Sequence, residues 1–213
     1  MGQDDEPFGG EQMNEFLFLV WTFSLNVSFA DETSLPVEPL TILLGEPTAE
    51  QQAQGEADFE AVYKVLQHPR CLNCHPSGDA PLQGDQSLPH AMNITRKSTE
   101  AGLECAACHQ TQNSDAYGIE GGPPGAPNWH LPSTDMPLVF EGRSVSELCI
   151  QLKDPSQNGQ MSLSELYTHI AHDPLVLWGW SPGGQRTVPP LTHSAFAAHF
   201  KGWVELGAPC PTP

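Results

Sequence analysis

The chain has 213 residues, with 8 basic against 26 acidic side chains and a formal net charge of −18. This length fits one ordinary domain or two small ones and excludes a large multidomain enzyme. The charge argues against nucleic-acid or anionic-membrane binding, because neutralising phosphates requires clustered Lys and Arg. With 19 Gly and 21 Pro, much of the backbone is expected to be loop.

Residues 16–30 form an apolar run that is too short, and too polar at its end, to span a bilayer. Ser28 and Ala30 occupy the two small-residue positions of a cleavage site, which predicts a secretory signal peptide over residues 1–30. No Lys or Arg precedes the run, so a buried N-terminal helix is the alternative. Residues 31–55 are poor in apolar side chains and are predicted to form a flexible tail.

Residues 56–213 are predicted to form one domain that is mainly α and loop-rich, with few or no strands. Apolar side chains recur at helical spacing over 57–67, which predicts an amphipathic helix. Residues 76–104 and 118–137 are rich in turn-forming residues and are expected to be mostly loop, apart from a short helical segment near 98–103.

Three further helices are predicted in the C-terminal part, residues 143–213. Two of them begin at capping boxes, in which a Ser and a Glu three residues later satisfy each other's backbone N–H groups. A third helix is expected from Thr192 to Leu206, with Gly207 ending it. The two capping boxes are formed by Ser144 with Glu147 and by Ser162 with Glu165.

Two stretches, CLNCH at 71–75 and CAACH at 105–109, match Cys-x-x-Cys-His, the attachment signature of c-type haem. Two thiols on one turn of backbone can each bond a haem vinyl group, and the following His can bind the iron from one side. We therefore predict two covalently bound haem c groups. The residues that hold them are Cys71, Cys74, His75, Cys105, Cys108 and His109.

Two other uses of these cysteines are possible. A thioredoxin-like redox pair would follow a strand–helix pattern, which neither motif shows. A zinc site built from both pairs would leave His75 and His109 unexplained. Haem attachment of this type takes place outside the cytosol, so a periplasmic or secreted protein is expected. The two remaining cysteines, Cys149 and Cys210, are then predicted to form a disulfide, with two free thiols as the alternative.

Each iron can take a second ligand on its far side, and three residues are preferred for this role. His90 lies in the loop between the motifs and is expected over the first haem, while His172 lies on a predicted helix face. Met136 is followed by Pro137 and Phe140, which resembles methionine-ligand neighbourhoods in small cytochromes c. His130, His169 and His193 come next, and His68 and His199 are expected at the surface.

The paired motifs resemble those of di-haem cytochromes c. A longer resemblance runs through HPRCLNCHPSGDAPLQGD, PPGAPNWHLPSTDMPLVFEG, LCIQLKDPSQNG, HIAHDPLVLWGWSPGGQR and WVELGAPCP. These stretches are similar to a bacterial family labelled "isoquinoline 1-oxidoreductase subunit". That resemblance implies a small secreted haem protein that accepts electrons from a molybdenum hydroxylase.

The function expected from these observations is electron transfer between protein partners by a periplasmic di-haem cytochrome. No integral membrane span is expected in the mature chain. Two alternatives need an iron with an open sixth position: a di-haem peroxidase-like enzyme and a haem-based sensor. The chain is short for a two-domain peroxidase, and only 8 Lys and Arg are available to act beside an open iron.

Overall fold

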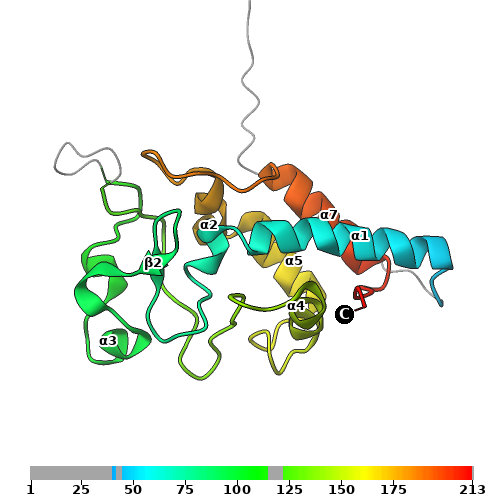
Figure 1. Ribbon diagram of the computed structural model, residues 1–213, viewed down its shortest axis with the longest axis horizontal. Coiled ribbons are helices and arrows are strands. Elements are labelled where there is room, and N and C mark those ends of the chain that lie inside the picture. Colours follow the sequence, from blue (N-terminus) through cyan, green and yellow to red (C-terminus); the bar gives the residue numbers. More distant parts are fainter. Residues whose placement is uncertain (1–39, 42–44, 115–121, 213) are drawn as a thin grey trace, which may run out of the picture. The chain divides into compact units, whose positions relative to one another are not determined.

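The structure, a computed structural model, describes residues 40–41, 45–114 and 122–212 (Figure 1). The predicted signal peptide lies outside these residues, as do residues 31–39 and 42–44 of the predicted tail. No helix within the described ranges is long and apolar enough to cross a membrane.

The described part of the chain is mainly helical, as predicted. Its α-helices are α1 (Ala49–Leu66), α2 (Pro69–Leu72), α3 (Arg96–Glu100), α4 (Val145–Lys153), α5 (Leu163–His172), α6 (Pro174–Leu177) and α7 (His193–Glu205). Three 3-10 turns are η1 (Ala91–Asn93), η2 (Cys105–Ala107) and η4 (Trp178–Trp180). A short antiparallel ladder pairs β1 (Leu82–Gln83) with β2 (Leu88–Pro89), and Leu82 lies opposite Pro89.

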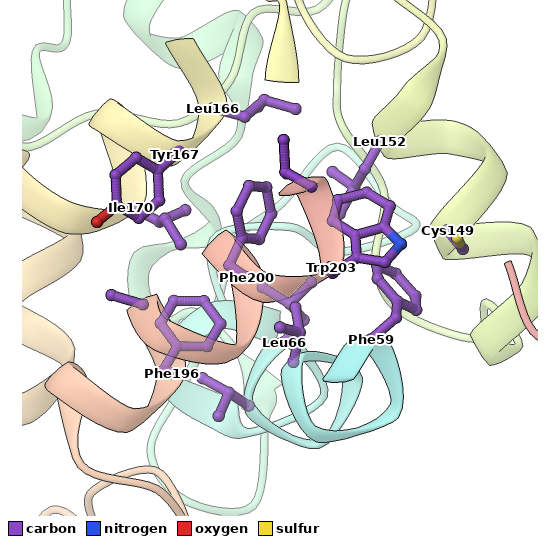
Figure 2. Packing of buried hydrophobic residues seen from close by; sticks show 14 of the residues in the cluster. Phe59, Leu66, Cys149, Leu152, Leu166, Tyr167, Ile170, Phe196, Phe200 and Trp203 are labelled. Carbon is purple, nitrogen blue, oxygen red and sulfur yellow. The ribbon is translucent and has the colours of Figure 1, made fainter. Parts of the chain in front are cut away.

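The hydrophobic core lies among α1, α4, α5 and α7, which we call the helical body. Helices α1 and α7 lie side by side and make the most extensive contact between any two elements (Figure 1). Figure 2 shows large side chains from these helices meeting around Trp203, which is fully buried. The ring centres of Phe59 and Trp203 are 4.8 Å apart, and those of Phe200 and Trp203 are 5.2 Å apart. Fully burying one such side chain stabilises a fold by about 2–3 kcal/mol.

Both predicted capping boxes are present. In α4 the Ser144 hydroxyl accepts from Glu147 N at 3.3 Å, and the Glu147 carboxylate accepts from Ser144 N at 2.8 Å. In α5 the same two bonds between Ser162 and Glu165 measure 3.2 and 2.8 Å. Thr192 caps α7 as expected. The polar and apolar pattern therefore located these three helices correctly.

The first helix begins earlier than predicted. Residues 49–55, expected in the flexible tail, belong to α1, because Thr48 and Gln51 form a further capping box. The run after Thr48 consists of good helix formers but has no apolar period, so the pattern gave no signal there. Gly55 lies so close to Pro209 that an added Cβ would come within 2.5 Å of the proline ring. This contact holds the early turns of α1 against the C-terminal segment.

The predicted disulfide between Cys149 and Cys210 is present, with 5.6 Å between the two Cα atoms. It attaches the segment after α7 to α4. The same segment is held by Trp203, whose indole N–H donates to the carbonyl of Pro209 at 2.9 Å, and by Lys153, which donates to the carbonyl of Ala208. The C-terminal residues are therefore part of the helical body.

Candidate haem-binding site

Each Cys-x-x-Cys-His motif forms a single turn of backbone. The N–H of Cys74 donates to the carbonyl of Cys71 at 3.1 Å, and the N–H of Cys108 donates to that of Cys105 at the same distance. The first turn continues α2, which begins at Pro69, and the second follows η2. None of the four motif cysteines forms a disulfide within the described part of the chain. The local geometry is the one-turn arrangement that thioether attachment requires.

The histidines of the two motifs are held in the same way. The Nδ1–H of His75 donates to the carbonyl of Leu138 at 2.8 Å, and that of His109 donates to the carbonyl of Pro124 at 2.7 Å. A donated Nδ1–H fixes the tautomer, so the lone pair is on Nε2. Metal-binding histidines are commonly oriented by such a bond. Both side chains are therefore prepared to bind a metal through Nε2.

An aromatic ring stacks on each of these histidines. Phe140 lies on His75 with ring centres 3.9 Å apart and 13° between the planes. Trp129 lies on His109 at 4.7 Å and 3°. Phe140 also ties its loop to the motif, because its backbone N–H donates to the carbonyl of His75 at 2.9 Å. Each motif histidine thus has its own carbonyl acceptor and its own stacked ring, and residues 124–140 supply all four.

A cavity of about 800 Å³ opens beside the second motif. Its volume is that of a site for a large organic ligand. Its walls contain many apolar side chains together with Cys105, Cys108 and His109, and also Cys74 of the first motif. Both motifs therefore contribute to one cavity, and the second contributes its complete set of attachment residues.

Burial controls the protonation of the motif residues. Burial lowers the pKa of His75 to about 4 and also lowers the pKa of His109, so both imidazoles are neutral near pH 7, as a metal ligand must be. Burial raises the pKa of Cys71 to about 12 and that of Cys74 to about 11. Redox-active and metal-binding cysteines have a lowered pKa instead. Both thiols of the first pair are therefore protonated near pH 7.

His90 lies beside the second motif. Its ring centre is 6.0 Å from that of His109, and both side chains line the cavity. The Nδ1–H of His90 donates to the carbonyl of Ala91, which leaves Nε2 for a ligand bond. We expected His90 over the first haem, whereas the structure places its ring beside His109 of the second motif. The β1–β2 ladder turns the chain back, and His90 N then bonds the carbonyl of Pro81 at 3.0 Å.

The other preferred candidates lie elsewhere. The Nε2 of His172 is buried and finds no hydrogen-bond partner among the described residues. Met136 is half-buried, two residues before the Leu138 carbonyl that holds His75. Nδ1 of His169 lies 3.1 Å from the carboxylate of Asp173, so Nε2 is the nitrogen that a ligand bond would use. These three residues remain candidates for the far side of the first iron.

The remaining histidines have other roles. Nε2 of His193 donates to the carbonyl of Ile170 at 2.9 Å, which uses the nitrogen that a ligand bond would need. His130 donates to the carbonyl of Asn128 directly after Trp129. His68 caps α2, and His199 is partly exposed on α7, where it pairs with Asp58 at 2.8 Å.

Three features of the site were not found from the sequence. The carbonyl acceptors and stacked rings come from residues 15 to 65 positions beyond their motif histidines. The role of Arg70, next to Cys71, was also not predicted. In the structure its side chain is only 2% exposed and lines the cavity. Of these three features, only Arg70 could have been suspected from the sequence, because it directly precedes the first motif.

Comparison of this chain with protein-family models, curated proteins and solved structures found no match. Within the described residues, no group of three or more His, Cys, Asp and Glu side chains is arranged to hold a metal ion.

Proposed function

We propose that the chain is a di-haem c-type cytochrome that transfers electrons in the periplasm or outside the cell. The observation that carries the proposal is that His75 and His109 have the same local surroundings. Each directly follows a Cys-x-x-Cys turn, donates its Nδ1–H to a backbone carbonyl and is stacked by an aromatic ring. Two independent copies of this arrangement are the pattern expected for two haem irons bound through Nε2.

The residues divide into anchors and ligands. Cys71 and Cys74 would attach one haem, and Cys105 and Cys108 the other. Haem iron supplies a one-electron redox couple, and its potential depends on the axial ligands and on burial. The protein's part is to hold each imidazole at a fixed angle and to exclude water from the cavity.

His90 is suited to be the second axial ligand at the second motif. Two imidazoles that bind one metal ion from opposite sides, each with a bond of about 2 Å, hold their ring centres about 6 Å apart. The observed separation of His90 and His109 is 6.0 Å. A closed, two-histidine iron favours electron transfer over the peroxidase and sensor alternatives, because both of these require an open position.

The charge of the chain suggests the nature of its partners. A net charge of −18 would favour redox proteins with a basic surface, and the complexes would be weak and transient. A molybdenum hydroxylase as electron donor, implied by the family resemblance, is the narrower form of this proposal. Electron transfer with such a donor should slow as ionic strength rises, because salt screens the attraction.

The direct test is to express the full chain in a host that matures c-type cytochromes. We expect a coloured protein whose mass exceeds that of the polypeptide by two haems. The double variant Cys105→Ser/Cys108→Ser should carry one haem only. A colourless product with the mass of the polypeptide would overturn the proposal.

The assignment of His90 has a separate test. The ferrous wild-type protein should not bind carbon monoxide at the second haem, whereas the His90→Ala variant should, because the substitution opens one iron. His199→Ala, which changes a histidine on α7 in the helical body, is the matched control. Carbon monoxide binding by the wild-type protein at this haem would instead favour the enzymatic or sensor alternative.

A further inference from the structure

The imidazole of His109 is held by two contacts, and each of these is supported from further out. Its Nδ1–H donates to the carbonyl of Pro124 at 2.7 Å. Trp129 stacks on its face, with ring centres 4.7 Å apart, and Trp178 contacts Trp129 edge to face at 4.8 Å. The place and the electronic state of the imidazole therefore depend on what holds Pro124 and Trp178.

One side chain, Asn113, bonds to both supports. Its Oδ1 accepts from the backbone N–H of Gly125 at 3.2 Å and from the indole N–H of Trp178 at 2.8 Å. Its Nδ2 donates to the carbonyl of Ser181 at 2.8 Å. These partners fix the orientation of the amide, because two N–H donors require its oxygen and a carbonyl requires its nitrogen. Asn113 therefore connects the chain that follows the second motif to η4 and the residue after it.

Pro124 and Gly125 share one peptide unit, which is hydrogen-bonded on both sides. Its N–H donates to Asn113, and its carbonyl accepts from His109. Hydrogen bonds in such a chain polarise one another, because a donated N–H makes the carbonyl of the same unit a stronger acceptor. A stronger acceptor draws the Nδ1 proton of His109 towards itself and makes Nε2 a more basic ligand. Asn113 thus acts on the nitrogen that would bind iron.

The same peptide unit is packed closely against the chain after the second motif. A Cβ added at Gly125 would come within 2.2 Å of the carbonyl oxygen of Gln112 and 2.4 Å of that of Gln110. The N–H of Ser114 donates to the carbonyl of Pro123 at 3.1 Å. Because backbone contacts also hold this unit, a change of the side-chain amide should alter its polarity more than its position.

The first motif has no equivalent of this amide in the described part of the chain. The carbonyl of Leu138 accepts from His75 as that of Pro124 does from His109. The N–H of that peptide unit belongs to Val139, and no side chain among the described residues accepts from it. An effect of the amide should therefore be confined to the second motif.

We propose that Asn113 is a positioning residue that sets the electron density on His109, and through it the redox potential of the second haem. The inference rests on the proposed function and extends it. It also links the turn that follows α6 to that haem, because the indole of Trp178 and the carbonyl of Ser181 hold the amide in place.

Removing the amide oxygen should raise the potential of the second haem. In Asn113→Leu, a substitution of similar size, the peptide N–H of Gly125 loses its acceptor. The bond from His109 to Pro124 weakens, and the imidazole donates less electron density. A less basic ligand stabilises the ferric state less. At a given potential the ferric to ferrous ratio should fall about threefold, which is about 28 mV at about 59 mV per tenfold change for one electron. The first haem should shift much less.

The experiment is a spectroscopic redox titration of the holo-protein and three variants. Asn113→Asp loses the bond to Ser181, as Asn113→Leu does, but keeps a stronger acceptor for Gly125 N–H. It should therefore lower the potential of the same haem. A loss of packing or of stability would not give shifts of opposite sign. Gln112→Glu places the same charge on the neighbouring exposed residue and is the matched control, with a smaller expected shift.

NMR of the reduced holo-protein with isotope-labelled histidine follows the hydrogen bond itself. In Asn113→Leu the Nδ1–H resonance of His109 should move upfield and exchange faster with solvent, whereas that of His75 should not change. If Asn113→Leu does not fold, the comparison of Asn113→Asp with Gln112→Glu carries the test by both methods.

The outcomes separate this inference from the function itself. A chain that acquires no haem overturns the proposed function. If both haems are attached and the two Asn113 variants titrate like the wild-type protein, or shift in the same direction, only the role of Asn113 is overturned. A shift in Asn113→Asp no larger than that in Gln112→Glu overturns it as well, because charge alone would then explain the result. Equal shifts of both haems have the same meaning.

Discussion

The helical body and the motif region, residues 73–141, are stabilised by different means. In the helical body, Phe59, Trp203 and their neighbours form a continuous cluster of buried apolar side chains. In the motif region, buried side chains include the polar Asn73 and Arg96, and residues of both motifs line a cavity of about 800 Å³. The first region is complete as a polypeptide, whereas the second is organised around a space that a ligand would fill.

Arg96 shows how the motif region is held without a core. Its guanidinium donates to the carbonyls of Pro132 at 2.9 Å, Gly78 at 2.6 Å and Pro137 at 3.4 Å. One side chain thus connects the loop after the first motif with the loop that holds His75. Hydrogen bonds of this kind each contribute only about 1–3 kcal/mol, and they do not replace buried apolar area. The comparison therefore predicts that the two regions respond differently when the haems are removed.

Removing the attachment sites should have the largest effect. In the fourfold variant Cys71→Ser/Cys74→Ser/Cys105→Ser/Cys108→Ser, we expect no bound haem and rapid proteolysis within residues 76–140, because that region loses the groups around which it folds. The helical body should keep its helical circular dichroism and resist cleavage. Limited proteolysis with mass analysis of the fragments would check this. First cleavage within α4, α5 or α7 would show that the helical body also depends on haem.

Removing the disulfide tests the helical body in the same way. The Cys149→Ala/Cys210→Ala variant opens a link between residues 61 positions apart. The chain-entropy model gives a loss of about 4 kcal/mol in the free energy of unfolding for a loop of this length. Denaturant unfolding would measure it.

A thiol reductant distinguishes the disulfide of the helical body from the thioether bonds proposed for the motif region. It should destabilise the wild-type helical body but leave both haems attached, because thioether bonds are not reduced by thiols. The variant should be indifferent to the reductant. Loss of haem from the wild-type protein under these conditions would mean that the groups are not bonded through sulfur.

Local patterns in the sequence were sufficient for much of the fold. The capping boxes at Ser144 and Ser162 were predicted correctly because both partners lie within four residues of each other. The motif turns were predicted for the same reason. The disulfide was found by counting the cysteines that the motifs left over, which does not require knowledge of the fold.

The parts that were missed depend on contacts between distant segments. Leu138 and Pro124 act through their carbonyls, so their side chains carry no sign of the role. The place of His90 beside the second motif was not expected, because it follows from the β1–β2 ladder, which is only two residues long in each strand. The early start of α1 depends on Thr48 and on the packing of Gly55 against Pro209. None of these contacts leaves a periodic pattern of polar and apolar residues in the sequence.

The smallest expected effect is at a helix cap of the helical body. Ser162→Ala removes the hydroxyl that accepts from Glu165 N at 3.2 Å and donates to the Glu165 carboxylate at 2.7 Å. The variant should lose about 1 kcal/mol in the free energy of unfolding at pH 7. Ser164→Ala changes an exposed serine two positions along α5 and is the matched control, for which no loss is expected.

The cap also predicts how this difference depends on pH. The hydroxyl of Ser162, and then its N–H, hold the pKa of Glu165 below its usual value of 4.5. A carboxyl with a lowered pKa in the folded state contributes stability that is complete above the unfolded pKa and is lost as pH falls through the folded one. The difference between wild type and Ser162→Ala should therefore be constant above about pH 5 and shrink below pH 4.5. Unfolding measured at pH 7 and pH 3 would show this, and a difference that grew on acidification would contradict the assigned role of Glu165.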